Sequence, residues 1–222
     1  MLAAAFETST RRPSVALRVD GAIREEHLSG ERPHASDLLP ALERLLTEAG
    51  KSVRDLGLIV VGTGPGSFTG LRVAAATALG LARGTGARLF GLPSVEALCW
   101  SALSVGEEAA VVLDARQGEL YFAHYRREIE SVLVLHAPSL VVPVELPALL
   151  PPAIRIFGEP GIDRAAALDS ATSARLEVDR QPSAAAVLEL GAARFAREGA
   201  HGIAGIEPLY LRAFASRSKT RG

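Results

Sequence analysis

The chain has only one cysteine, Cys99, among its 222 residues. A single thiol excludes an internal disulfide framework and a metal site built from several cysteines. The apolar neighbours of this thiol in the segment EALCW indicate a small buried core residue. Five histidines are present, but no two of them are three or four residues apart. A helix face that carries a pair of histidine ligands is therefore also excluded.

The sequence also lacks a strong charge of one sign and a long hydrophobic run. Its formal net charge is −1 and its pI is about 6.5, which gives no field for tight binding to nucleic acid or membranes. No apolar segment approaches the ~20 residues of a membrane span. The N-terminal segment MLAAAFETSTRR is interrupted by Glu7 too early for a signal peptide. We therefore expect a cytoplasmic protein with no membrane partner.

Aromatic residues make up only 5% of the chain, whereas hydrophobic residues in total make up 48%. The core is therefore expected to consist mainly of Ala, Leu and Val. A chain of this length can bury one large core or two small ones.

Strand and helix patterns alternate along the first half of the chain. Apolar alternation predicts strands, tight turns such as Asp20-Gly21 separate them, and leucines at helical spacing predict helices. Ser36 or Asp37 can cap the first helix, and Ser94 can cap the third. In chain order, the predicted elements are strands at 1–6, 14–19 and 22–28, a helix at 36–49, a strand at 57–62, a helix at 67–83, a strand at 87–92 and a third helix.

Three strands followed by alternating helices and strands indicate an α/β fold, with a mixed sheet and helices packed on it. This is the order of the ribonuclease-H-like fold, whose duplicated form builds the actin/Hsp70/sugar-kinase superfamily. The second half repeats the three-strand pattern in AAVVLDARQGELYFAHYR and SVLVLHA but has fewer helical segments. We predict two ribonuclease-H-like domains, at 1–104 and 105–222. The second is expected to be degenerate and to end in a helix and a disordered tail.

A glycine-rich loop, GTGPGSFTGLR at 62–72, joins the predicted strand at 57–62 to the second helix. It lacks the lysine of a Walker loop, the glycine spacing of a dinucleotide site and the flanking glycines of a nucleophile elbow. Two interpretations remain: an anion site at the free N–H groups of the helix start, or a tight turn for close packing. The residues of this possible anion or shared nucleotide contact are Gly64, Pro65, Gly66, Ser67, Phe68, Thr69, Gly70 and Arg72.

The second helix is apolar on all sides, which is typical of a helix buried on every face. Small residues at three- and four-residue spacing, such as Gly70, Ala74 and Ala78, would let another helix approach closely. The cover could come from a partner chain or from the third and last helices of this chain. We favour a partner chain.

Two carboxylates stand at predicted strand ends. Glu7 ends the first strand, where ribonuclease-H-like enzymes place a metal-binding Asp, but the turn Thr8-Ser9-Thr10 lacks the glycine that ATP users need beside a phosphate. We favour a carboxylate that caps its own turn. Asp114 ends a strand in the second half and is either a partner carboxylate or a turn former before Gly118.

Several of these segments together resemble the TsaB (YeaZ) family, the accessory subunit for making threonylcarbamoyladenosine in bacterial tRNA. GTGPGSFTGLR is nearly the family's G-x-GPGSFTGLR, and the resemblance covers most of the chain. The chain departs from the family at Glu7, where the family usually has Asp, and this weakens a metal site there. The other matching segments are ETST followed by SVAL, HASDLLPALERLLTEAG, PSVEAL, LDARQGELYFAHY and PLYLR.

The resemblance implies a non-catalytic subunit with no cofactor or metal of its own. The helices at 36–49 and 67–83 would bind TsaD, the catalytic subunit that transfers a threonylcarbamoyl group to the adenosine next to the anticodon. The ATPase TsaE would join this complex, tRNA would be bound only through it, and the same face would form a homodimer without TsaD. The residues predicted to bind the partner are Leu39, Leu42, Leu46, Leu71, Ala74, Ala75 and Ala78.

The alternative is an enzyme that acts alone, either an ATP-dependent transferase or a metallopeptidase of the same superfamily. That function requires Glu7 and Asp114 to converge on a metal ion.

Overall fold

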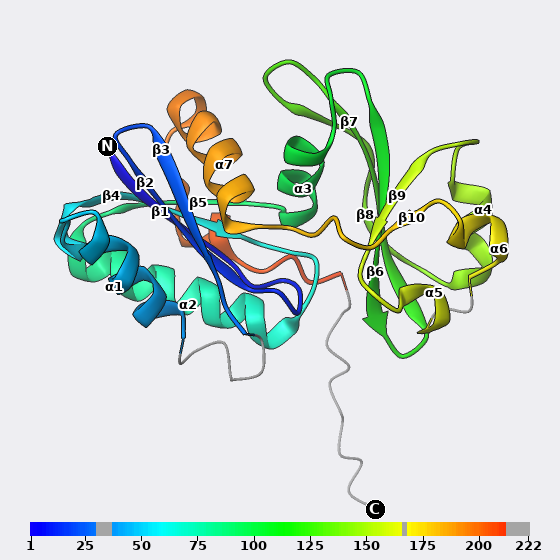
Figure 1. Ribbon diagram of the computed structural model, residues 1–222, viewed down its shortest axis with the longest axis horizontal. Helices are drawn as coiled ribbons and strands as arrows, with labels where there is room; N and C mark the ends of the chain where they lie inside the picture. The colour runs from blue at the N-terminus through cyan, green and yellow to red at the C-terminus, as the bar shows by residue number, and fades with distance from the viewer. Residues whose placement is uncertain (30–36, 166–167, 212–222) are drawn as a thin grey trace, which may run out of the picture.

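The computed structural model describes residues 1–29, 37–165 and 168–211. Two five-stranded sheets lie next to each other, and helices accompany both of them (Figure 1). The strands of the first sheet are β1 (Leu2–Glu7), β2 (Ser14–Val19), β3 (Ala22–His27), β4 (Leu56–Gly62) and β5 (Arg88–Leu92). Their order in the sheet is β3-β2-β1-β4-β5. β2 is antiparallel to both β1 and β3, and β4 and β5 are parallel to β1.

The second sheet repeats this arrangement. Its strands are β6 (Glu108–Arg116), β7 (Glu119–Arg127), β8 (Val132–Val141), β9 (Arg155–Gly158) and β10 (Leu176–Glu177). Their order is β10-β9-β6-β7-β8, with β6, β7 and β8 antiparallel and with β9 and β10 parallel to β6. The two sheets therefore have the same topology, and the α/β fold with two ribonuclease-H-like units is confirmed.

Apart from α7, the helices of the second half have only four residues each and are shorter than those of the first half. Those of the first half are α1 (Leu38–Glu48), α2 (Phe68–Thr85) and α3 (Ser94–Ala102). Those of the second half are α4 (Leu146–Leu149), α5 (Ile162–Ala165), α6 (Ser170–Ser173) and α7 (Ala184–Glu198), and short 3₁₀ turns are η2 (Val53–Asp55), η3 (Pro143–Glu145) and η4 (Ile203–Ile206). No helix in the described part of the chain is both long enough and apolar enough to cross a membrane.

Local sequence accounts for where these elements start and stop. Asp37 is the N-cap of α1, which leaves Pro40 in the first turn, where its missing N–H costs no helical hydrogen bond. Asp20 and Gly21 both have positive φ, as a two-residue hairpin turn between β2 and β3 requires. The predicted helices at 36–49 and 67–83 agree with α1 and α2 to within two residues. Ser36 and the predicted tail lie outside the described residues.

The last helix of each half packs against the sheet of the other half. Helix α3 contacts β7 and β8 of the second sheet, whereas α7 contacts β1, β2, β4 and β5 of the first sheet. The two helices also contact each other between the lobes (Figure 1). We predicted that the last helix belongs to a second domain at 105–222. In the structure, α7 instead packs on the first sheet, because α1 and α2 cover only one face of that sheet and α7 covers the apolar opposite face. The domain boundary at residue 104 stays a prediction.

One of three apolar clusters includes residues of both lobes, each lobe being one sheet with the helices of its half of the chain. It includes Val60 of β4, Leu98 of α3, Val111 of β6 and Leu188 of α7, all buried. A second cluster lies between the first sheet and α1 and α2, and a third lies between the second sheet and the short helices.

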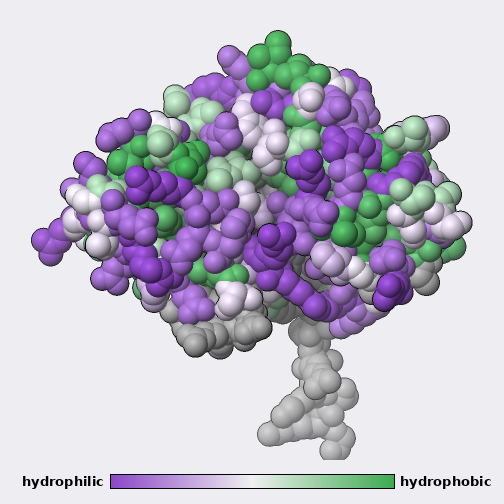
Figure 2. Space-filling model, viewed as in Figure 1, coloured by the Kyte–Doolittle hydropathy of each residue, from purple (hydrophilic) through white to green (hydrophobic). Residues whose placement is uncertain are grey.

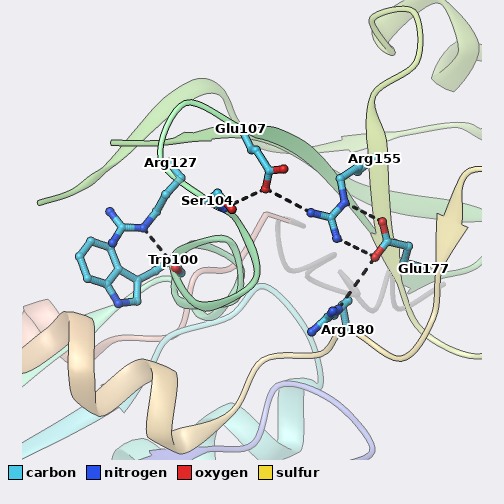
Figure 3. Close-up of polar contacts among 7 residues, drawn as sticks. All are labelled: Trp100, Ser104, Glu107, Arg127, Arg155, Glu177 and Arg180. Carbon is cyan, nitrogen blue, oxygen red and sulfur yellow. Dashed lines mark hydrogen bonds and ion pairs between the residues drawn. The ribbon is translucent and has the colours of Figure 1, made fainter. Parts of the chain in front are cut away.

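Charged residues connect the two chain segments that run between the lobes. Glu107, in the segment from α3 to β6, contacts Arg155 of β9 at 3.4 Å. Arg155 donates to Glu177 at 2.7 Å, and Glu177 lies 3.9 Å from Arg180 in the segment that leads to α7. Figure 3 shows this row of residues beside Arg127, which stacks on Trp100. These ion pairs therefore connect the segment between α3 and β6 to the segment that leads to α7.

Candidate partner surface and glycine loop

Helices α1 and α2 lie on the same face of the first sheet, with the apolar side of each turned toward the strands (Figure 1). Of the seven residues predicted to bind a partner, only Leu39 and Ala75 reach the surface; Leu39 is 47% exposed and Ala75 is half-buried. The other five are covered by the chain itself: Leu42, Leu46, Leu71, Ala74 and Ala78. This corrects the prediction, because a partner cannot touch side chains that already pack on the sheet.

Beyond Phe68 at its start, the outward side of α2 consists mainly of small and basic residues. Ala76 and Gly80 are exposed along its middle, and a methyl group added to Gly80 would meet no atom within 4 Å. On α1 the exposed residues are Leu39, Pro40, Glu43, Arg44, Thr47 and Glu48. The expectation that α2 is buried on every face is therefore wrong within the chain, since one face packs on the sheet and the opposite face is open.

The turn between β1 and β2 fills the space in front of the glycine loop. A side chain at Gly66 would collide with the backbone carbonyl of Ser9, and one at Gly70 would collide with the carbonyl of Thr8. Gly64 has φ +97°, which a residue with a side chain rarely adopts. The loop thus needs glycine because two backbone segments approach each other closely, as the packing interpretation predicted.

The start of α2 finds acceptors within the chain. The Ser67 N–H donates to the Ser9 carbonyl at 2.7 Å, and the Gly70 N–H donates to the Ser67 hydroxyl at 3.2 Å, which makes Ser67 the N-cap. An anion would have to displace these partners, because the same N–H groups would bind it. This local geometry favours a packed turn over an anion site at Ser67 and Gly70.

Glu7 lies at the end of β1, beneath the glycine loop, and is completely buried. Its Oε1 accepts a hydrogen bond from the Ser9 N–H at 2.6 Å, and its Oε2 lies against Gly62 without a hydrogen-bond partner. Burial raises the pKa of this carboxyl group, although the neighbouring Ser9 and Ser94 act in the opposite direction. A carboxyl group that is hydrogen-bonded to its own turn agrees with the capping role that the sequence favoured.

Asp114 serves the hairpin turn of its own sheet. Its Oδ1 accepts a hydrogen bond from the Arg116 N–H at 2.7 Å, and its Oδ2 lies 3.1 Å from the Arg116 guanidinium group. Its backbone N–H donates to Glu159 at 2.9 Å. Among the described residues there is no group of three or more His, Cys, Asp or Glu side chains placed to hold a metal ion. The geometry therefore corresponds to the turn-forming alternative for Asp114.

The C-terminal segment returns to the glycine loop, which the sequence did not indicate. The His201 N–H donates to the Leu89 carbonyl at 2.8 Å, so this segment runs along the free edge of β5. The Leu209 N–H then donates to the Thr63 carbonyl at 2.8 Å. The segment therefore connects the end of α7 to the loop between β4 and α2.

An exposed cluster of two aromatic rings and an arginine forms where this segment reaches α2. Arg72 lies over the Phe68 ring at 3.8 Å and donates from Nε to the Tyr210 hydroxyl at 2.8 Å. The two rings are 5.4 Å apart. Tyr210 belongs to the PLYLR segment, so a motif was visible in the sequence, but its contact with a residue 138 positions earlier was not.

Comparison with known proteins places this geometry in a family. The family model described as "TsaD: tRNA N6-adenosine threonylcarbamoyltransferase" matches residues 28–193. The chain is 34% identical over 130 residues to the Escherichia coli tRNA threonylcarbamoyladenosine biosynthesis protein TsaB, and 33% identical over 126 residues to the Haemophilus influenzae protein of the same name. These matches cover 58% and 56% of this chain. They cover 56% and 53% of the relatives, so the chain spans about half the length of the curated relatives it matches.

A solved structure extends the similarity to nearly the whole chain. YeaZ from Pseudomonas aeruginosa superposes with a TM-score of 0.80 and 27% identity, over 95% of this chain and 99% of that chain. The sequence matches, the family model and this superposition agree with the resemblance of GTGPGSFTGLR to the family motif. The chain therefore belongs to the TsaD (tRNA N6-adenosine threonylcarbamoyltransferase) family, among its TsaB (YeaZ) members.

Proposed function

We propose that this chain is a non-catalytic subunit for making threonylcarbamoyladenosine in tRNA, and that it binds TsaD through the outward side of α1 and α2. Relatives named for tRNA threonylcarbamoyladenosine biosynthesis support the pathway. The observation that carries the binding role is the outward side of α2. There Ala76 and Gly80 leave a shallow surface on which a partner helix can approach the backbone closely.

The neighbouring residues on α1 suit an interface of mixed character. Leu39 offers an exposed apolar contact, while Glu43 and Arg44 offer charges of both signs. Arg44 is also bound to Glu26 of β3, so its guanidinium group is held near the surface of the helix. An apolar centre with a charged rim is the usual composition of a protein interface.

The arrangement of the carboxylates speaks against the alternative of an enzyme that acts alone. Glu7 is buried and bonded to its own turn, and Asp114 is bonded to Arg116. Neither carboxylate extends toward an open site. The proposal also includes TsaE as a further partner, tRNA bound only through the complex, a homodimer without TsaD and a cytoplasmic location.

Substitution on the open side of α2 tests the binding role. Ala76→Glu and Gly80→Glu each place a carboxylate on the proposed interface, and we expect at least tenfold weaker binding of TsaD from the same organism. Ala196→Glu on the exposed side of α7 is the matched control, because it makes the same change on another helix. Binding is measured by calorimetry and function by tRNA modification with the reconstituted subunits. Undiminished binding of both α2 variants would contradict the proposal.

Titration of the purified chain with Mg-ATP and with Zn²⁺ tests the non-catalytic assignment separately. We expect no binding heat for either ligand, because neither Glu7 nor Asp114 is available to a metal ion. A saturable signal that Asp114→Asn abolishes would restore the enzyme alternative.

A further inference from the structure

Three segments that are far apart in the sequence meet at the end of the first sheet where β1 and β4 finish (Figure 1). The Ser67 N–H donates to the Ser9 carbonyl, which joins the glycine loop to the turn between β1 and β2. The Leu209 N–H donates to the Thr63 carbonyl, which joins the C-terminal segment to the same loop. The side chains that these segments expose therefore lie together at one end of the first lobe.

Two aromatic rings are exposed at this end. Phe68 is 42% exposed and Tyr210 is 40% exposed, and their ring centroids are 5.4 Å apart. Burial of a ring in a core is strongly favourable, and most of the surface in Figure 2 is hydrophilic. Two adjacent rings that stay in contact with water are therefore typical of a binding surface.

Arg72 holds the two rings in place. Its guanidinium carbon lies 3.8 Å from the centroid of the Phe68 ring and 5.5 Å from that of Tyr210. Its Nε also donates to the Tyr210 hydroxyl at 2.8 Å. Because these contacts restrict the rotation of both rings, a flat ligand that packs on them loses little of its binding free energy to ordering the site. Aromatic rings and guanidinium planes are the groups on which proteins stack unpaired RNA bases.

The charge around the rings is positive. The turn between β1 and β2 contributes Arg11 and Arg12, which are both exposed, and the glycine loop contributes Arg72. Neither segment contains an acidic residue, and Glu7, which precedes the turn, is completely buried. Consecutive Cα atoms are ~3.8 Å apart, so Arg11 and Arg12 begin within about 12 Å of Ser9, which contacts the loop.

We propose that this aromatic–arginine surface, formed by Arg11, Arg12, Phe68, Arg72 and Tyr210, binds unpaired nucleotides of tRNA when the chain is in complex with TsaD. A base stacks on the two rings, and the turn arginines contact the phosphates on either side of it. The inference rests on the proposed function, because TsaD brings the tRNA to the complex. The chain then adds to the RNA contact of the catalytic subunit and takes no part in the chemistry.

The charge pattern favours RNA over a second protein contact at this surface. The outward side of α1, which we propose to face TsaD, has charges of both signs in Glu43 and Arg44. The aromatic–arginine surface combines arginines with rings and exposes no carboxylate from the turn or the loop, which suits the repeated phosphates of a single strand. Three arginines are too few for tight binding of tRNA by the chain alone, since affinity rises with the number of phosphates contacted.

Substitution of the rings tests the stacking. Phe68→Leu and Tyr210→Leu keep an apolar side chain but remove the ring, so each should weaken the binding of tRNA to the complex roughly tenfold. Phe68→Tyr and Tyr210→Phe are the matched controls, because they keep the ring, and their affinity should stay close to that of the wild type. Fluorescence anisotropy of labelled tRNA measures the affinity, and circular dichroism checks that each variant folds.

Substitution of the turn arginines tests the phosphate contacts. Arg11→Gln and Arg12→Gln should each reduce the slope of log affinity against log salt concentration by about 0.7, the value for one phosphate of a single strand. Arg54→Gln is the control, because Arg54 is exposed in η2 at the opposite end of β4. Its slope should equal that of the wild-type complex.

Calorimetric titration of every variant with TsaD, without tRNA, separates this proposal from the proposed function. The ring and arginine variants should bind TsaD as the wild-type chain does. Unchanged tRNA affinity of both leucine variants would overturn the RNA contact, and so would a loss of TsaD binding that accounts for their whole loss of tRNA affinity, since the surface would then contact protein. A wild-type chain that does not bind TsaD would contradict the proposed function itself.

Discussion

At the scale of single residues, the glycine content of the loop at 62–72 follows from how closely its backbone approaches the turn between β1 and β2. Thr8 and Ser9 place their carbonyl groups against Gly70 and Gly66, and the Glu7 carboxyl group lies against Gly62. Three consecutive residues at the end of β1 and in the turn after it therefore each face one glycine of the loop. This pairing explains why the motif is rich in glycine although it lacks the residues of a nucleotide site.

The less space a glycine of α2 or its loop has, the more its substitution should destabilise the chain. Gly66→Ala and Gly70→Ala should each cost about 2–4 kcal/mol, because a backbone carbonyl occupies the position of the new methyl group. Gly80→Ala in α2 is the control, and it should stabilise the chain by about 0.5–1 kcal/mol because its methyl group meets no atom. Urea denaturation measures all three. Equal effects at the three positions would contradict this account of the loop.

The raised pKa of Glu7 predicts a pH dependence of stability. The folded chain holds a proton on this carboxyl group above pH 4.5, whereas the unfolded chain releases it. Its contribution to stability is therefore complete below about pH 4.5 and is lost as the pH rises through the folded pKa. Glu7→Gln keeps a neutral side chain at every pH, so its melting temperature should exceed that of the wild type by more at pH 8 than at pH 5.

The exposed Glu43→Gln is the control for this comparison, and its melting temperature should follow the wild type at both pH values. A Glu7→Gln variant that is less stable than the wild type by the same amount at both pH values would mean that the buried group is ionised.

At the scale of elements, the sequence was sufficient to locate α1, α2, α3 and α7, but not the short helices α4, α5 and α6 and not the orientation of α2. The leucine stripe of α1 is interrupted by charged residues, so its apolar side was clear from the sequence. In α2, alanine and glycine occur on every side, and periodicity cannot distinguish the side that packs on a sheet from the side that stays open. Ala74 and Ala78 are buried whereas Ala76 and Gly80 are exposed, and only tertiary packing decides between them.

Helices α3 and α7 are joined by a buried ion pair that the sequence could not reveal. Glu96 and Arg194 are 98 positions apart, and Glu96 is almost completely buried. Burial raises the pKa of Glu96, although Arg194 acts in the opposite direction. Loss of the arginine would leave this carboxyl group without its charge partner in the core.

Arg194→Met should therefore destabilise the chain by about 3–5 kcal/mol, because it removes one member of a buried pair. The double variant Glu96→Gln/Arg194→Met should recover much of that loss, since no buried charge remains. Chemical denaturation of the wild type, both single variants and the double variant gives the coupling between the two residues. Additive losses in this cycle would show that the pair does not couple the helices.

At the scale of the whole molecule, the exchange of α3 and α7 makes the two lobes dependent on each other. Repetition of the three-strand pattern predicted two similar units, and the identical strand orders confirm it. The sequence could not show that each unit lends its last helix to the other sheet, because the apolar side of α7 would suit either one. This exchange is also why one core cluster includes residues of both lobes.

A fragment of residues 1–104 should therefore fail to fold alone. Without α7, one apolar face of the first sheet would be exposed to water, including Val60 and Leu92. Heteronuclear NMR of the fragment should show the narrow amide dispersion of an unfolded chain, whereas the full chain should unfold in one cooperative transition. A well-dispersed spectrum of the fragment would show that the first lobe is an independent domain.

The return of α7 to the first sheet also affects how the chain is made. The strands β1, β2, β4 and β5 leave the ribosome while the residues that will cover them, 184–198, have not yet been translated. At bacterial rates of about 5–20 residues per second, this leaves the sheet half-covered for several seconds or more. The nascent chain is therefore a natural client for chaperones that bind apolar strands, and its yield in the cell should depend on them.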